Sequence, residues 1–196
     1  MNRGRRTNYL IMLLAVTALA GHLRIATAKE PVDSVRILID ISGSMKQNDP
    51  HNLRAPALRM LANLLPKGSR ASVWTFAKYA NELVPYQTVD ASWQQSANQK
   101  SREIASPGQF TDIEEALIKI RRGWETPSPD ENRSIILLTD GMVDVSKNPE
   151  ESKQSRKNII DALIPQLRFS KIKIHTIALS KNADIDLMKR LSENTD

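Results

Sequence analysis

Two stretches of the chain are aliphatic nearly throughout, and both change abruptly to small and polar residues. VRILID occupies 35–40 and is followed by ISGS, while SIILLT occupies 134–139 and is followed by DG. Strands without polar alternation are typical of parallel sheets, in which helices cover both faces. Three further segments predict strands, at 70–77, 81–89 and 171–180. Pro85, within the second of these segments, is typical of an edge strand.

Five segments between and after these strands predict helices, at 53–65, 90–105, 111–123, 151–170 and 184–194. Strands and helices therefore alternate, which predicts an α/β fold with a doubly wound, mostly parallel sheet flanked by helices, of the Rossmann-like kind. Ligands bind such sheets at the carboxyl ends of the strands. We therefore expect a functional site where the two aliphatic strands end, at Asp40 and Asp140.

The first residues of the chain have the composition of a signal peptide. A basic start, NRGRR, precedes the apolar run YLIMLLAVTALAG, which has about the length of a secretory h-region and is short for a membrane span. Cleavage sites of the A-x-A kind end at Ala20 and Ala28. We expect an exported protein, periplasmic or envelope-associated, with a signal peptide at 1–28 and one domain at 33–196. Retention of the uncleaved segment as a membrane anchor is the alternative.

Charge and cysteine content exclude some partners and sites. The chain carries 28 Lys and Arg against 22 Asp and Glu, a formal charge of +6, but residues 1–28 contain four of the Arg and no acid. Without those four Arg, 24 basic and 22 acidic residues remain. This near balance presents no electrostatic case for nucleic acid. Because the chain has no Cys, it has no disulfides and no thiolate metal site.

Oxygen-bearing side chains follow the two aliphatic strands and precede the third predicted helix. Asp40, Ser42 and Ser44 alternate just past the first strand end, where alternate side chains can turn toward one point. Thr111 opens the helix, and Asp140 follows the second strand. Carboxylates and neutral hydroxyls are hard oxygen ligands, which suit Mg²⁺. These five residues therefore predict a Mg²⁺ site, with Mn²⁺ or Ca²⁺ as substitutes.

The motifs DISGS, FTDIEEAL and LLTDG, in this order on strand–loop–helix units, resemble those of the von Willebrand factor A domain, and most of all its exported bacterial branch. The resemblance covers residues 35–196. It implies a metal-ion-dependent adhesion site, in which Ser42, Ser44 and Thr111 bind the metal directly and the two Asp bind it directly or through water. It also implies that a Glu or Asp of another protein completes the coordination. The expected function is therefore metal-dependent protein binding, not catalysis.

Each of these residues has a plainer interpretation when it is taken alone. Thr111 and Glu114 fit a helix-capping box, and Asp140 followed by Gly fits an ordinary turn. Only the joint pattern favours the metal site. His51 and Asp144 lie in the loops after the first and third motifs, so we take them as candidates for the rim that contacts the partner.

Two other functions are compatible with part of the pattern. A strand running into LIDISGS is similar to the start of haloacid-dehalogenase-type phosphatases, whose nucleophilic Asp is followed two residues later by an acid/base Asp. Ser42 stands at that second position and cannot act as a general acid near neutral pH. The other alternative is a structural von Willebrand A scaffold without metal. The family fold usually closes with one more strand after the helix at 184–194, so we also expect a fragment of a longer product, with a C-terminal extension or membrane anchor.

Overall fold

The computed structural model describes residues 30–180 and 183–195. Contacts along the chain define one compact domain, Pro31–Asp196. The predicted signal peptide at 1–28 lies outside the described residues. No helix in the described ranges is both long and apolar enough to cross a membrane.

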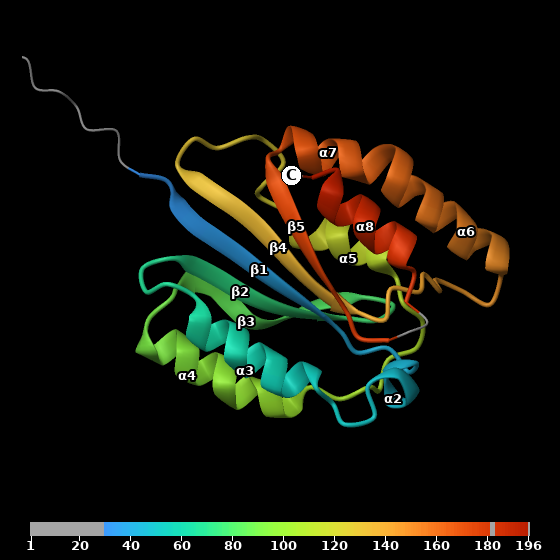
Figure 1. The fold of residues 1–196 in the computed structure, drawn as a ribbon, viewed down its shortest axis with the longest axis horizontal. Coiled ribbons are helices and arrows are strands. Elements are labelled where there is room, and N and C mark those ends of the chain that lie inside the picture. Colours follow the sequence, from blue (N-terminus) through green and yellow to red (C-terminus); the bar gives the residue numbers. More distant parts are fainter. Residues whose placement is uncertain (1–29, 181–182, 196) are drawn as a thin grey trace, which may run out of the picture. The chain divides into compact units, whose positions relative to one another are not determined.

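A five-stranded sheet runs through the domain in the order β3-β2-β1-β4-β5 (Figure 1). Its strands are β1 Val32–Asp40, β2 Arg70–Phe76, β3 Ala80–Thr88, β4 Glu131–Thr139 and β5 Ile172–Ala178. β1 pairs in parallel with both β2 and β4, and β5 is parallel to β4, whereas β3 at one edge is antiparallel. The predicted mostly parallel α/β sheet is therefore confirmed, and Pro85 does lie in its edge strand.

Helices cover both faces of this sheet (Figure 1). One face carries α3 (Arg54–Leu64) and α4 (Ala91–Lys100). The other face carries α5 (Ile113–Ile120), α6 (Pro149–Asn158), α7 (Ile164–Phe169) and α8 (Ile185–Glu193). A short helix that the sequence did not predict, α2 (Met45–Asn48), follows the DISGS loop directly.

The helix predicted at 151–170 is not regular throughout. A π-helical segment, Ile159–Leu163, joins α6 to α7. Pro165, in the first turn of α7, has no backbone N–H, and its ring would clash with the carbonyl group four residues earlier in a regular α-helix. The wider π turn that precedes the proline lets the chain continue as a helix at this point.

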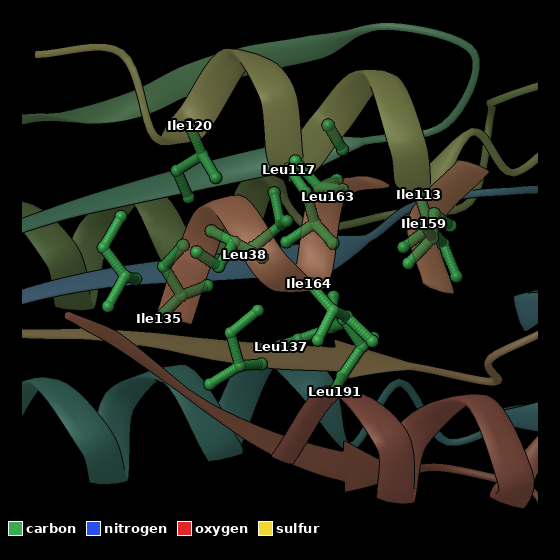
Figure 2. Packing of buried hydrophobic residues seen from close by; sticks show 14 of the residues in the cluster. Leu38, Ile113, Leu117, Ile120, Ile135, Leu137, Ile159, Leu163, Ile164 and Leu191 are labelled. Carbon is green, nitrogen blue, oxygen red and sulfur yellow. The ribbon is translucent and has the colours of Figure 1, made fainter. Parts of the chain in front are cut away.

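The aliphatic character of β1 follows from its place between two apolar clusters. Leu38 packs in the cluster that the sheet forms with α5, α7 and α8 (Figure 2), whereas Ile37 and Ile39 pack in the cluster formed with α3 and α4. All three side chains are fully buried. Because burial of one such side chain stabilises the fold by about 1.5–3 kcal/mol, the second half of the strand is aliphatic until it ends at Asp40.

At the amino end of the sheet, a buried arginine fixes α5. The guanidinium carbon of Arg36, on β1, lies 3.7 Å from the centroid of the Trp124 ring, and Arg36 donates to the carbonyl oxygens of Ile120 and Arg122. Burial lowers the pKa of Arg36 to about 10, so the side chain remains charged at neutral pH. Its contacts therefore bind the C-terminal end of the helix that Thr111 precedes.

The loop before α5 is hydrogen-bonded to the ends of two strands. The Gly108 amide donates to the Ile41 carbonyl oxygen over 3.1 Å, and the Asp112 amide donates to the Ala77 carbonyl oxygen over 2.8 Å. A Cβ atom on Gly108 would lie 2.3 Å from the Ala77 Cβ and 2.9 Å from the Ile41 oxygen. The absence of a side chain at Gly108 is therefore what lets this loop approach β1 and β2 so closely.

We expect Gly108→Ala to lower the free energy of unfolding by about 1–3 kcal/mol, the usual effect of overpacking. Denaturation in urea measures this loss. Gly43→Ala is the matched control, because the nearest atom to its added Cβ lies at 3.2 Å and a smaller loss is expected there. Equal losses for the two variants would mean that the close approach at Gly108 is not a constraint on the fold.

Candidate metal centre

Two aspartates stand side by side at the carboxyl edge of the sheet. Asp40 is the last residue of β1, and Asp140 directly follows β4, the parallel neighbour of β1. Both residues are fully buried. The Asp40 carboxylate accepts one hydrogen bond from the Ser42 amide, over 2.8 Å, and one from the Thr139 hydroxyl, over 2.6 Å. It is therefore held in one orientation by the loop after its own strand and by the end of the neighbouring strand.

The two serine hydroxyls connect the first loop to the second aspartate. The Ser44 hydroxyl donates to Asp140 Oδ2 over 2.5 Å, and Ser42 Oγ lies 3.0 Å from Ser44 Oγ. Ser44 is the N-cap residue of α2, but its side chain makes no capping bond, so its hydroxyl faces the site. Asn48, on α2, also donates to Asp140 Oδ2, over 2.9 Å. Sequence reasoning missed Asn48 because a helix of four residues has no periodic pattern.

Backbone pairing with the loop after β4 brings Thr111 to the same place. Its amide donates to the Asp144 carbonyl oxygen over 2.6 Å, and the Asp144 amide donates back over 3.1 Å. The capping-box interpretation of Thr111 is wrong, because Asp112 is the N-cap of α5 and accepts a bond from the Glu115 amide over 2.9 Å. Capping of α5 therefore does not use the Thr111 hydroxyl.

Three hydroxyl-bearing residues, Ser42, Ser44 and Thr111, line one pocket of about 510 Å³. The rest of its wall consists of Gly43, Gly108, Gln109, Phe110, Asp144 and Lys147. Of the two rim candidates, Asp144 lines the pocket, whereas His51 is exposed but is not among the lining residues. The predicted hydroxyl ligands thus share one hollow, and the two aspartates are buried behind them.

The two buried aspartates concentrate negative charge, and no basic side chain of the described residues pairs with either of them. Burial and, to a smaller extent, the neighbouring Asp140 charge raise the pKa of Asp40 to about 6, although hydrogen bonds from Ser42 and Thr139 act in the opposite direction. Among the residues the structure describes, neither aspartate forms an ion pair, and no three His, Cys, Asp or Glu side chains cluster as a metal site. Buried carboxylates are unfavourable unless a cation compensates them. The set of carboxylate and hydroxyl oxygens therefore fits a hard divalent cation such as Mg²⁺.

A family match covers nearly all of the described domain. A sequence model of the von Willebrand factor type A domain matches residues 34–196. The chain belongs to the von Willebrand factor type A domain family. Domains of this family are generally protein-interaction modules and not enzymes. No match was found among curated protein sequences.

Solved structures that share the von Willebrand A fold with this chain have distant sequences. They include a von Willebrand factor type A protein from Catenulispora acidiphila (18% identity, TM-score 0.57), BatB from Bacteroides thetaiotaomicron (17%, 0.58) and an aerotolerance-related membrane protein from Bacteroides fragilis (17%, 0.58). The matches cover 82%, 83% and 83% of this chain and 43%, 86% and 87% of the other chains. The chain thus spans less than half of the Catenulispora protein. At these identities the likeness shows the fold alone.

A buried arginine holds the loops of this von Willebrand A domain together, and sequence reasoning missed it. Arg54, 1% exposed at the start of α3, donates to Asp49 Oδ2 (2.8 Å), the Asp40 carbonyl oxygen (2.6 Å) and the Ser106 hydroxyl (2.8 Å). Asp49 also accepts bonds from the amides of Leu53 and Arg54. One side chain therefore ties the end of β1 to two loops beside the site. An arginine on an amphipathic helix normally faces water, so the helical pattern carried no signal for this role.

Arg54→Met should lower the free energy of unfolding by about 3–5 kcal/mol, because it leaves the buried Asp49 carboxylate without its partner. Urea denaturation measures the loss, and the double variant Arg54→Met/Asp49→Asn should recover part of it. The control is Arg59→Met, at an exposed position of the same helix, which should stay within about 0.5 kcal/mol of the parent. A loss at position 54 no larger than that at position 59 would contradict the role of Arg54.

Proposed function

We propose that this domain is an exported protein-binding module that holds one Mg²⁺ at the carboxyl edge of its sheet and thereby captures an acidic side chain of another protein. The observation that carries the proposal is the donor set. Two buried aspartates, with no ion pair in the described residues, lie behind three hydroxyl-bearing residues that line a pocket. Membership of a family whose domains are generally interaction modules supports the choice of a protein as the partner.

The hydroxyl-bearing residues and the aspartates would have different roles at such an ion. Ser42, Ser44 and Thr111 would hold it through their hydroxyl oxygens, since these residues line the pocket. Asp40 and Asp140 would supply negative charge from behind, directly or through water. Bound Mg²⁺ supplies a concentrated positive charge, which neutral hydroxyls compensate poorly on the pocket side. A partner's Glu or Asp is therefore attracted there, and Mn²⁺ or Ca²⁺ would serve as substitute ions.

Export is part of the proposal and is supported by sequence. The basic start and apolar run of residues 1–28, which lie outside the described residues, are typical of a secretory signal. One structural neighbour, from Bacteroides fragilis, is described as a membrane protein. We expect the domain in the periplasm or at the envelope. Anchoring would come from an uncleaved N-terminal segment.

The geometry disfavours the phosphatase alternative. In that reaction the Asp40 carboxylate would be the nucleophile, but Asp40 is fully buried. Both of its carboxylate oxygens also accept hydrogen bonds from within the chain, one from Ser42 and one from Thr139. An attacking carboxylate has to reach the substrate phosphorus, and the full burial of Asp40 opposes this, while Ser42 stands where such enzymes have their acid/base Asp. A structural scaffold without metal would show no change in thermal stability when Mg²⁺ is added, whereas the proposed module would be stabilised.

Saturating Mg²⁺ should raise the thermal unfolding midpoint, because a ligand that binds only the folded state stabilises it by about 2.7 kcal/mol at one hundred times its Kd. Asp40→Ala should abolish this Mg²⁺-dependent shift, whatever it does to the midpoint in EDTA. Glu150→Ala, at an exposed position of α6, is the control and should keep the shift. An identical Mg²⁺-dependent shift in the parent and in Asp40→Ala would contradict the proposal.

Position 111 allows a ligand oxygen to be removed without loss of volume. Thr111→Val should weaken Mg²⁺ binding about tenfold or more, whereas Thr111→Ser retains the hydroxyl and should bind nearly as the parent does. Isothermal titration calorimetry measures both affinities. His51→Ala should leave the Mg²⁺ affinity unchanged and should weaken only partner binding if His51 lies on the rim.

Once a partner protein is identified, a substitution in the partner tests whether its carboxylate completes the metal site. Changing its key Glu or Asp to the amide should remove most of the Mg²⁺-dependent affinity, and Thr111→Val should weaken binding in parallel. Binding that survives both chelation and the amide substitution would place the interface elsewhere on the domain.

A further inference from the structure

The pocket beside the three hydroxyls is larger than one carboxylate group needs. Its volume is about 510 Å³, and its wall continues past Thr111 to Gln109, Phe110 and Lys147. Pockets of roughly 300–1,000 Å³ are typical of sites that bind whole small ligands. The additional wall therefore offers contacts to the groups that flank a bound carboxylate.

Phe110 has an unusual backbone conformation at this wall. Its φ is +63°, in the left-handed region that costs a residue with a side chain about 1–2 kcal/mol and that Gly, Asn or Asp occupies more readily. Backbone hydrogen bonds fix the chain on both sides, from Gly108 to Ile41 and between Thr111 and Asp144. The ring belongs to neither apolar cluster of the core. A strained aromatic residue outside the core points to a role at the surface.

Two lysines flank the same wall. The Lys78 ammonium lies 5.8 Å from the centroid of the Phe110 ring and 5.5 Å from that of Tyr79, which is 60% exposed. Lys147 lines the pocket itself. In the part of the chain that the structure describes, neither lysine forms an ion pair. Asp144 and Lys147 carry opposite charges among the lining residues, and Lys78 adds a second positive charge next to Phe110.

We propose that this pocket binds an extended acidic peptide segment, in which the carboxylate that completes the metal stands next to an apolar side chain packed against Phe110. Further carboxylates in the segment are attracted by Lys78 and Lys147, which speed the encounter at low salt. The inference rests on the proposed function, because it places the partner's carboxylate at the hydroxyls. A carboxylate that binds without an apolar neighbour, and a partner that is not acidic, are competing outcomes.

Synthetic peptides with one flexible Gly/Ser frame serve as the probes. All carry an acidic residue near one end, and they differ at two central positions, which are Leu–Glu, Ser–Glu, Leu–Gln or Ser–Gln. Chemical-shift titration of the Mg²⁺-loaded domain measures their affinities, since it detects even weak binding. The Leu–Glu peptide should bind about tenfold more tightly than the Ser–Glu peptide, the usual scale for one apolar group in a pocket. Both Gln peptides should lose the Mg²⁺-dependent part of binding.

Phe110→Asn removes the aromatic ring without disturbing the backbone, because Asn readily adopts the left-handed conformation. Its thermal midpoint should equal or exceed that of the parent, whereas the preference for Leu–Glu over Ser–Glu should disappear. Lys147→Gln should weaken both Glu peptides about threefold at low salt. The matched controls are Phe169→Asn, at a residue that is 68% exposed, and Lys67→Gln. Both residues shortly precede the start of a strand, so they lie at the amino edge of the sheet, away from the pocket. Neither control should alter peptide binding.

A titration with Mg²⁺ alone separates this inference from the proposed function. If the domain binds no Mg²⁺, the proposed function fails. If it binds Mg²⁺ but the Leu–Glu and Ser–Glu peptides bind equally, or if Phe110→Asn keeps the preference for Leu, the inference fails and the metal site stands. Failure of every peptide to bind the Mg²⁺-loaded domain likewise overturns the inference.

Discussion

Parallel pairing of β1 with β4 is the constraint on which the whole site depends. In this register Ile39 lies opposite Leu138, so the two strands end together. The Thr139 hydroxyl can therefore reach the Asp40 carboxylate, and Asp140 follows at the same edge. A slip of one residue would turn the strand's side chains to the opposite face. The close packing of Leu38 in one apolar cluster and of Ile37 and Ile39 in the other opposes such a slip, so the core keeps the ends of the two strands aligned.

The donors of the site are arranged by contacts that need no ion. Arg54 ties the end of β1 to neighbouring loops, Gly108 lets the loop before α5 lie against the strand ends, and backbone bonds join Thr111 to Asp144. A site held in this way loses little conformational freedom when it binds a ligand, because its geometry already exists. The same contacts shape the pocket wall at Phe110, so the proposed metal and peptide contacts share one rigid support.

Charge is layered from the core to the rim. Buried carboxylates lie behind the hydroxyls, while Lys78 and Lys147 lie around the outer wall. Without an ion, the two aspartates would repel an acidic partner, whereas a bound dication would cancel their charge and present its own positive charge to the pocket. In the proposed function, dependence on metal thus arises from the buried charges themselves, while the lysines favour acidic segments over neutral ones.

The sequence by itself determined the sheet and the place of the two aspartates. Aliphatic runs without polar alternation are stable only when both faces are buried, and the change to small polar residues marked both strand ends. Tertiary structure alone decided the roles of Asn48, Arg54 and Phe110. Asn48 lies 92 positions from the aspartate that it contacts, Arg54 is buried by contacts with separate loops, and Phe110 is strained because its neighbours are fixed. A local pattern shows which residues are apolar, but a polar side chain can be buried only where distant segments supply its partners, and only the folded chain brings those segments together.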